Sequence, residues 1–488
     1  MSPHPGVVAA GHRRTAGAAA NVLRSGGTAF DAAIAAIAMA CVCEPILCSP
    51  GGGGFAAFRR GDSVSFLDCF SHTPAARRQP SGAGVHEVFA DFGTATQAFH
   101  IGPATAATPG LFAGIEALHR IGATWSLADL FAPAAAAARG GVTVTPFQHH
   151  LATVVEPILR ATPAAAELFA PGGSLLAPGD SFRNPGLADA LELMATDGFA
   201  GSGVGDACVA AQADAGHLTA HDLAAYEAIE RPPLTVDLAG DTVHLNPLPA
   251  AGGTLVAHTL HQLRAHDPVA LANAIAATGE ARSRAALDDL NGLVVRQRGT
   301  THVSVIDAAG HACAVTVSNG EGNGALVGEF GFMLNNVLGE EDVNAHGPDD
   351  WPTATRLSSM MCPTIVEGAD GSLTVLGSGG SNRIRSAIAQ FLVRLCVDRA
   401  DLADAVAAPR LHVERGRLEF EDRFDDEQRT RLTEAFPDHR GWARPDLFFG
   451  GVHAARRSVD GELSGAGDER RDGVAVVVDR PGLPQPQR

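Results

Sequence analysis

A Gly-Thr bond deep inside the chain is followed at once by a predicted strand. Gly299 and Thr300 precede residues 301–306, where apolar residues alternate with other side chains. A turn at 308–310 then leads to a second alternating run, Ala312–Ser318. Alternation with a period of two predicts half-buried strands. The sequence therefore predicts two adjacent strands, the first of which starts with a hydroxyl residue directly after glycine.

The Gly299–Thr300 bond is a candidate self-cleavage site. After cleavage, Thr300 would carry a hydroxyl and a free α-amine on one short framework. Such an amine has a reference pKa of about 7.7–8.0, so much of it is an unprotonated base near neutral pH. Threonine with its own N-terminal amine is a known nucleophile–base pair. The alternative is an ordinary Thr-Thr pair that is present because threonine favours strands.

Length and composition leave the number of domains open. The 488 residues would allow about three domains of ordinary size. No long linker interrupts the chain, so one large domain is an equal alternative. The hydrophobic fraction of 45% fits a globular core. No run of eighteen apolar residues and no signal-like start occurs, so we expect a cytoplasmic protein without a membrane span.

The charged residues exclude several classes of function. The net charge is −18, with 36 basic and 54 acidic residues, which opposes general binding of nucleic acid. The sequence contains no lysine, so every basic residue in that count is arginine. A Walker A phosphate loop, Schiff-base chemistry and a Ser-Lys hydrolase all require lysine. These mechanisms are therefore excluded.

The eight cysteines are interpreted as buried free thiols. Three of them form the cluster Cys41-x-Cys43-x4-Cys48, which raises the alternative of a metal site. However, the first two lie on an apolar predicted helix, and no CxxC pair occurs in the chain. Free cysteine behaves as a small hydrophobic residue.

The order of predicted elements favours an α+β fold. A capping box at 28–31 starts a helix that is apolar on all sides to residue 43 and therefore buried. Four glycines at 51–54 then allow close backbone packing before a strand at 55–58. Further helices are expected at 111–121, 127–139, 185–197, 222–226 and 383–395, and further strands at 234–245, 364–367, 373–376 and 473–478. Helices flanking two strand-rich layers fit a sandwich.

A glycine-rich turn between a strand and a helix is a candidate oxyanion hole. The run Gly377-Ser378-Gly379-Gly380-Ser381-Asn382 exposes backbone N–H groups at the positive end of the following helix. A dinucleotide-binding loop is the alternative, but the acidic residue at the expected spacing, Asp398, follows a helix rather than a strand. A Ser/His/Asp triad is disfavoured because no G-x-S-x-G elbow exists.

Taken together, these segments resemble the γ-glutamyltranspeptidase family of N-terminal-nucleophile hydrolases. The match runs in order along nearly the whole chain. It includes LRSGGTAFDAAIAAIAMACVCEP, GGGGF, TPGLFAGIEALHR, HLTAHDLAAY and LPAAGGT in the first part. GTTHVSVID is similar to the family's processing site, and RLSSMMCPTIV, GSGGSNR, FFGGVH and GAGDERRDG resemble later motifs.

The resemblance implies an αββα sandwich that is made as a single proenzyme. Thr300 would attack the Gly299 carbonyl, leaving a large subunit, 1–299, and a small subunit, 300–488, tightly associated in one folded domain. The mature Thr300 would then form an acyl-enzyme with a small-molecule substrate, and water or an acceptor amine would resolve it. No cofactor or catalytic metal is implied, and a dimer of two processed heterodimers stays open.

The resemblance also assigns roles to individual residues by position. Ser318 corresponds to a threonine that hydrogen-bonds the nucleophile, and Gly380 and Ser381 to the oxyanion donors, with Gly379 and Gly380 as the alternative pair. Substrate-binding roles fall on a second group: Ser358 and Ser359 for the donor carboxylate, Asn319 as a loose match, and Glu340 near the family's amine-binding aspartate.

Departures from the family pattern concentrate on recognition of the glutamyl group. Phe70 stands where the family has a carboxylate-binding arginine, although Arg77 or Arg78 lies nearby in sequence, and Val337 replaces a glutamine. A bidentate Arg–carboxylate contact is strong and geometry-specific. We therefore expect a carboxylate-bearing donor other than a standard γ-glutamyl amide. Alternatives are a C–C bond hydrolase of an alkylproline-type natural-product pathway, an ordinary γ-glutamyltransferase or glutathione hydrolase, and a non-catalytic scaffold.

Overall fold

The computed structural model describes residues 5–479 except 79–83, 92–95, 213–214, 264, 266, 289–298, 341–342, 345–346 and 349. Its centre is a seven-stranded sheet in which β11 and β12 form the middle pair. The strand order is β20 (Val474–Val478), β1 (Gly6–Ala10), β11 (Thr301–Asp307), β12 (Ala312–Ser318), β2 (Gly53–Arg60), β3 (Ser63–Cys69) and β8 (Ile229–Arg231). All neighbouring strands in this sheet are antiparallel.

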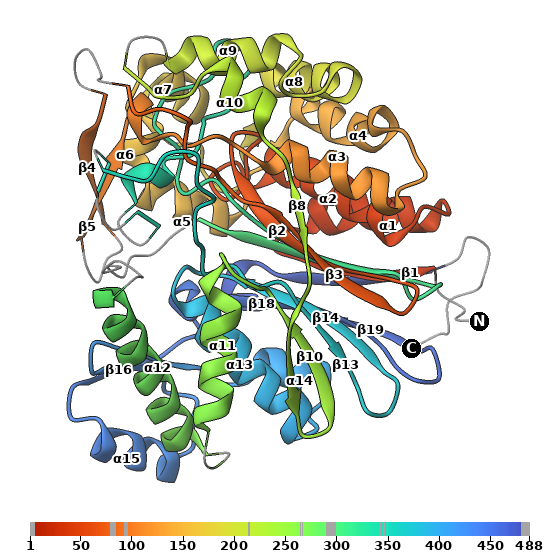
Figure 1. The fold of residues 1–488 in the computed structure, drawn as a ribbon, viewed down its shortest axis with the longest axis vertical. Coiled ribbons are helices and arrows are strands. Elements are labelled where there is room, and N and C mark those ends of the chain that lie inside the picture. Colours follow the sequence, from red (N-terminus) through yellow and green to blue (C-terminus); the bar gives the residue numbers. More distant parts are fainter. Residues whose placement is uncertain are drawn as a thin grey trace.

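A second sheet of six strands packs face to face against the first (Figure 1). Its order is β19 (Leu463–Ala466), β18 (Gly451–Arg457), β14 (Leu373–Gly379), β13 (Thr364–Glu367), β10 (Asp241–Leu245) and β9 (Leu234–Leu238). A buried apolar layer from both sheets fills the space between them, including Phe66, Ile306, Ile365 and Val375. Alternate residues of each strand point into this layer because successive side chains face opposite sides of a sheet.

Helices cover the outer face of each sheet, which gives the four layers visible in Figure 1. The seven-stranded sheet is covered by α1 (Arg13–Arg24), α2 (Ala29–Cys43) and α3 (Leu111–Gly122). Helix α4 (Leu127–Gly140) packs on α2, and α8 (Pro185–Asp197) packs on α4. The six-stranded sheet is covered by α11 (Ala251–Gln262), α13 (Arg383–Leu392) and α14 (Leu402–Ala407). The αββα sandwich expected from the sequence is therefore confirmed.

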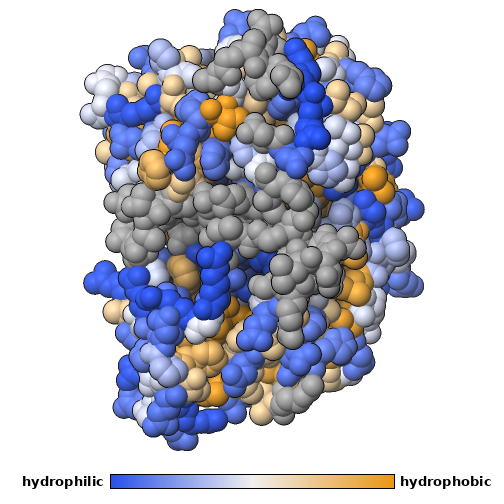
Figure 2. All heavy atoms as spheres, turned by 60° about the vertical axis from the view of Figure 1, so that its left-hand side comes forward, coloured by the Kyte–Doolittle hydropathy of each residue, from blue (hydrophilic) through white to orange (hydrophobic). Residues whose placement is uncertain are grey.

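The remaining elements lie around these layers. They are β4 (His86–Asp91), β5 (Thr96–Ile101), α5 (Pro146–Val154), α6 (Glu156–Leu159), α7 (Pro163–Phe169), α9 (Gly203–Gln212), α10 (Ala220–Ala225), α12 (Pro268–Asp288), α15 (Asp426–Ala435), β6 (Val142–Thr143), β7 (Ser181–Phe182), β15 (Leu411–Glu414), β16 (Arg417–Glu421) and β17 (His439–Trp442). On the face shown in Figure 2, hydrophilic residues cover most of the described surface, and hydrophobic residues gather toward its lower part. None of the described helices is long and apolar enough to cross a membrane.

Helix α2 shows how local sequence fixes an inner element. Thr28 caps its start, and the Asp31 carboxylate accepts hydrogen bonds from the Thr28 backbone N–H and side chain, so the predicted capping box is present. All fifteen residues of the helix are buried, as its continuous apolar sequence indicates. The helix ends before Glu44, which is itself buried.

Several predicted boundaries differ from the observed ones. Strand β14 continues to Gly379, three residues past the predicted end at 376, because its glycines still pair with β18. The regular part of α13 ends at Leu392, and a π-helical turn, Val393–Val397, replaces the predicted continuation to 395. Helix α10 starts at Ala220 rather than at 222 because Thr219 forms a capping box with Asp222. All eight cysteines are free and buried, as predicted.

Strands from before and after Gly299 take part in both sheets. In the larger sheet β1 lies between β20 and β11, and β2 lies beside β12. In the smaller sheet β10 pairs with β13. The strand that follows the Gly299–Thr300 bond, β11, thus lies near the middle of the larger sheet, between β1 from the first part of the chain and β12 from the second.

Candidate active site

Thr300 lies directly before β11 and lines a pocket between the ends of the two sheets. Its side chain is buried, with 4% of the residue exposed. The pocket encloses about 400 Å³ of space, part of it open to solvent. The described residues that line it are Phe70, Thr300, Ser318, Val337, Glu340, Val343, Ser359, Met360, Met361, Ser381 and Ile384.

Ser318 is hydrogen-bonded to the carbonyl of the candidate cleavage bond. The Ser318 Oγ donates to the Gly299 oxygen at 2.6 Å and accepts from the Gly320 N–H at 3.1 Å. Thr301 pairs with Val317 in the ladder between β11 and β12, which brings the end of β12 beside this bond. A hydroxyl donor at a carbonyl oxygen stabilises negative charge that develops there during nucleophilic attack.

Two further contacts hold Gly299 in place. Its backbone N–H donates to the Glu321 Oε1 at 3.1 Å. A Cβ atom at Gly299 would lie 2.7 Å from the backbone oxygens of both Gly320 and Ile46, too close for any side chain. Glycine is therefore required before Thr300 for reasons of space, which explains one half of the Gly-Thr pair.

The carbonyl of Thr300 faces the end of β14. The Arg471 Nη1 donates to the Thr300 oxygen at 3.4 Å, and burial lowers the pKa of this arginine to about 10. A Cβ at Gly379 would lie 2.3 Å from the same oxygen. The last glycine of β14 thus allows the close approach that places the turn after this strand next to Thr300.

The turn itself has an unusual backbone. Gly380 has a φ of 121° and Ser381 a φ of 53°, so both residues adopt left-handed conformations. Such a conformation is uncommon for a residue other than glycine and occurs often at functional sites. Helix α13 follows directly at Arg383, and Ser381 lines the pocket. Backbone N–H groups at this positive helix end can stabilise an oxyanion.

The other predicted substrate-binding residues are divided between two places. Ser359 and Glu340 line the pocket of Thr300, and the Ser359 Oγ accepts from the Met361 N–H at 3.1 Å. Ser358 is half-buried and is not among the described lining residues. The Asn319 Nδ2 donates to the Met333 oxygen at 3.4 Å, and Asn319 lines a separate cavity. The structure therefore does not bring Asn319 into this pocket.

Phe70 lines the pocket, and the two arginines near it in sequence do not. Arg77 pairs with Asp350 at the surface, and the Arg78 N–H donates to the His217 Nδ1 at 3.1 Å. A different arginine, Arg356, contacts the backbone of Phe70, and no motif in the sequence indicated this contact. The Arg356 Nη1 donates to the Phe70 oxygen at 2.6 Å and so anchors its backbone.

Glu44 is a second residue near the site that sequence reasoning missed. It is fully buried, and it accepts hydrogen bonds from the hydroxyls of Thr301, at 2.6 Å, and Thr15, at 2.7 Å. Burial raises the pKa of this carboxyl to about 7, against the lowering effect of both hydroxyl donors. The only signal in the sequence was an acidic residue after an entirely apolar helix.

His302, which follows Thr301, is a structural residue. Its ring contacts the hydroxyls of Thr316, at 2.8 Å, and Ser304, at 2.9 Å, inside the sandwich. Burial holds its pKa well below the ordinary value, so the ring is neutral. A Cβ at Gly377 would lie 2.3 Å from this ring, which explains the first glycine of the turn sequence.

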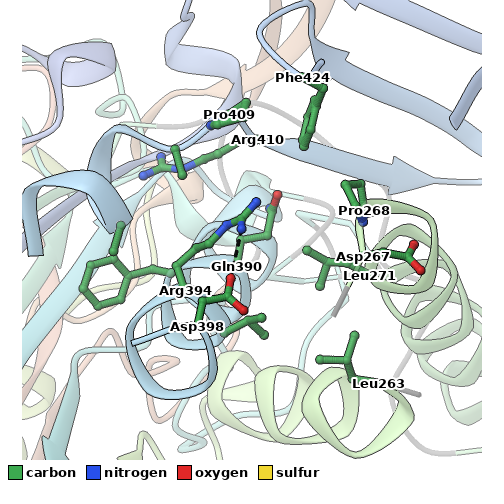
Figure 3. A pocket seen from close by; sticks show the side chains of 14 residues that line it. Leu263, Asp267, Pro268, Leu271, Gln390, Arg394, Asp398, Pro409, Arg410 and Phe424 are labelled. Carbon is green, nitrogen blue, oxygen red and sulfur yellow. Dashed lines mark hydrogen bonds and ion pairs between the residues drawn. The ribbon is translucent and has the colours of Figure 1, made fainter. Parts of the chain in front are cut away.

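Another pocket lies between α12, α13 and α14. Figure 3 shows its side chains, with the Arg394–Asp398 ion pair of 2.9 Å among them. The described residues that line it are all different from those that line the pocket of Thr300. Within the described ranges, no group of three or more His, Cys, Asp and Glu residues is arranged to hold a metal ion.

The fold and the site together define a class of enzyme. A buried threonine begins a central strand of a two-sheet αββα sandwich, with a hydroxyl donor on the preceding carbonyl. This is the architecture of the N-terminal-nucleophile hydrolases, and the protein is an enzyme of that class.

Comparisons with known proteins give the family. The sequence profile described as Gamma-glutamyltranspeptidase matches residues 15–286 and 270–478, so the chain belongs to the γ-glutamyltranspeptidase family. It is 27% identical to an acylase ACY 1 proenzyme of Pseudomonas sp., over 97% of this chain and 93% of that protein. It is 28% identical to a glutathione hydrolase proenzyme of Escherichia coli, over 80% and 78% of the two chains.

A solved structure has the same fold over nearly its full length. The cephalosporin acylase from Bacillus halodurans superposes with a TM-score of 0.80 at 20% identity, covering 97% of this chain and 96% of that one. At this identity the likeness concerns the fold alone.

Proposed function

We propose that the protein is a self-processing hydrolase or acyltransferase whose nucleophile is Thr300. In the processing step, the Thr300 hydroxyl oxygen bonds to the Gly299 carbonyl carbon, and the Gly299–Thr300 C–N bond breaks. The hydroxyl proton moves to the released amine. Water then hydrolyses the ester, leaving a carboxylate on Gly299 and a free hydroxyl and amine on Thr300. The observation that carries this proposal is the 2.6 Å hydrogen bond from Ser318 to the Gly299 oxygen.

The same groups then act on a substrate. The Thr300 amine takes the hydroxyl proton as the oxygen attacks an acyl carbon, and it returns that proton to the leaving group. Backbone N–H groups of Gly380 and Ser381 stabilise the oxyanion, and water or an amine releases the acyl group. The names of two relatives support this proposal, because the acylase and the glutathione hydrolase are both proenzymes.

The donor is proposed to differ from a standard γ-glutamyl amide. Phe70 occupies the pocket where a carboxylate-binding arginine is expected, and its backbone is fixed by Arg356. A γ-glutamyl group therefore lacks a strong ionic partner among the described residues of this wall. Association of residues 1–299 with 300–488 after cleavage is part of the proposal, since strands of both segments share each sheet.

Intact-mass and N-terminal analysis of the purified protein tests the proposal. The wild-type chain of 50.1 kDa is expected to give two fragments, one of which begins at Thr300. Thr300→Ala is expected to give one uncut, inactive chain, and Thr300→Ser a slower cut at the same bond. The proposed nucleophile would be refuted by two results together: the wild-type chain stays uncut, and Thr300→Ala hydrolyses acyl substrates as fast as the wild type does.

A further inference from the structure

The pocket beside Thr300 is lined mainly by apolar side chains. Six of them contribute to its wall: Phe70, Val337, Val343, Met360, Met361 and Ile384. They come from four separate parts of the chain, namely the segment after β3, the segment 337–343, the loop before β13 and the first turn of α13. Because four independent segments supply the same kind of surface, its apolar character belongs to the pocket as a whole.

Phe70 is fixed as part of this wall. Its ring stacks on that of Phe55, with centroids 5.6 Å apart, and only 2% of the residue is exposed. Its carbonyl accepts hydrogen bonds from the Tyr226 hydroxyl and from the Arg356 Nη1, both at 2.6 Å. Its N–H donates to the Asp68 Oδ1 at 3.2 Å. Both the ring and the backbone are therefore held, and the residue presents a permanent apolar surface.

The buried arginines closest to this region point to other partners. Arg356 lies 3.7 Å from the Asp68 carboxylate and donates to backbone oxygens of Phe70 and Glu227. Arg383 stacks over the Phe448 ring at 4.2 Å, and Arg471 donates to backbone oxygens. None of the described residues that line the pocket carries a positive charge.

A charged acyl group is a poor match for such a wall. A buried carboxylate needs an opposite charge to offset its lost hydration, and the carboxyl in this pocket, Glu340, has the wrong sign. By contrast, each buried methylene of an apolar group improves binding by about fourfold. The lining therefore argues against the carboxylate-bearing donor that the sequence predicts.

We propose that this pocket binds the uncharged, apolar acyl group of an amide or ester, with Phe70 as the residue that excludes charged donors. The inference rests on the proposed acyl-enzyme at Thr300. It adds the chemical class of the donor: an aliphatic or aromatic acyl chain whose carbonyl lies between Thr300 and Ser381. The polar residues among the described lining are Thr300, Ser318, Glu340, Ser359 and Ser381.

A matched series of 4-nitroanilides tests the inference on the processed enzyme. Acetyl, butyryl and hexanoyl anilides vary the apolar length, and glutaryl and γ-glutamyl anilides add charge at a similar size. We expect kcat/KM to rise about fourfold per methylene from acetyl to hexanoyl. We expect hexanoyl to exceed glutaryl by at least about 100-fold, because glutaryl places its carboxylate in the apolar wall.

Phe70→Arg is expected to reverse the preference between the two anilides: the ratio of kcat/KM for hexanoyl to that for glutaryl should fall by about 100-fold or more. Phe89→Arg is the matched control, because Phe89 is 58% exposed on β4 and is not a lining residue. It is expected to keep the wild-type preference. Phe70→Leu keeps the wall apolar and serves if the arginine variant does not fold; it is expected to retain the exclusion of glutaryl while changing the best chain length.

The outcomes separate this inference from the proposed function. Cleavage before Thr300 together with a preference for glutaryl or γ-glutamyl anilide would overturn the apolar acyl pocket and leave the nucleophile intact. Cleavage with no turnover of any acyl anilide would also overturn it. Absence of cleavage, or activity that survives Thr300→Ala, would instead refute the proposed function itself.

Discussion

Replacement of Glu44 by glutamine should change how stability depends on pH. In the folded protein this carboxyl is completely buried under Thr15 and Thr301, and Asp472 adds a weaker effect in the same direction as burial. Its pKa therefore rises from 4.5 to about 7. Between these two values the folded protein holds a proton that the unfolded chain has lost. The contribution of the Glu44 carboxyl to stability is thus largest below pH 4.5 and is lost as the pH rises through 7.

The size of the effect follows from the same two pKa values. At 1.36 kcal/mol per pH unit, the rise from 4.5 to about 7 corresponds to about 3 kcal/mol in total. Most of this, about 2 to 3 kcal/mol, falls between pH 5 and pH 8. Glutamine does not titrate, so the difference in unfolding free energy between wild type and Glu44→Gln should decrease by that amount over this range.

Urea unfolding at a series of pH values measures this difference. Both proteins should carry Thr300→Ala, so that a single uncut chain unfolds in each case. Burial lowers the pKa of the neighbouring His453 ring to about 4. This ring titrates in both proteins, so its contribution cancels from the difference in unfolding free energy. Glu167→Gln, on the exposed side of α7, controls for the substitution itself. A Glu44→Gln difference that stays constant within about 0.5 kcal/mol from pH 5 to pH 8 would refute the reasoning.

Three other predictions concern the cleavage bond and the thiols. Ser318→Ala should slow cleavage by on the order of 100-fold, because the Gly299 oxygen loses its hydroxyl donor. Ser318→Thr keeps a hydroxyl and should cleave at a rate near that of wild type. A mass-spectrometric time course of the uncut chain measures both rates, and equal rates for the two variants would contradict this role of the hydroxyl. Gly379→Ala should give an uncut or unstable protein, since its Cβ would lie 2.3 Å from the Thr300 oxygen; mass and thermal unfolding report this, and normal cleavage would contradict it. The eight buried thiols, such as Cys362 with a pKa raised to about 11, should not react with a thiol reagent at pH 8 until the protein is unfolded, and rapid labelling of the native protein would show the burial to be wrong.

Local patterns in the sequence predicted the elements that depend on local interactions. The bounds of β12 and β13 match the predicted ones because alternation and turn residues define both strands. The start of α2 was predictable from the capping box at Thr28. The resemblance assigns Ser318 a hydrogen bond to the nucleophile, whereas its hydroxyl donates to the Gly299 oxygen in the structure.

Residues whose partners lie far away in the chain could not be found in this way. Glu44 is 257 positions from Thr301, and Arg356 is 286 positions from Phe70. Neither pair leaves a periodic or spaced motif, so only the packed structure brings its members together. Asn319 directly follows Ser318, the last residue of β12, yet the two residues line different cavities, and no pattern in the sequence indicates this.

The mixing of early and late strands in each sheet has a consequence for the chain after a break before Thr300. Release of either piece would require the loss of four ladders at once, β20 with β1, β1 with β11, β12 with β2, and β10 with β13. Neither piece alone contains a complete sheet of the sandwich on which to fold. Dilution should therefore never separate the two polypeptides, and the loss of their association and the loss of the native state should occur in one transition.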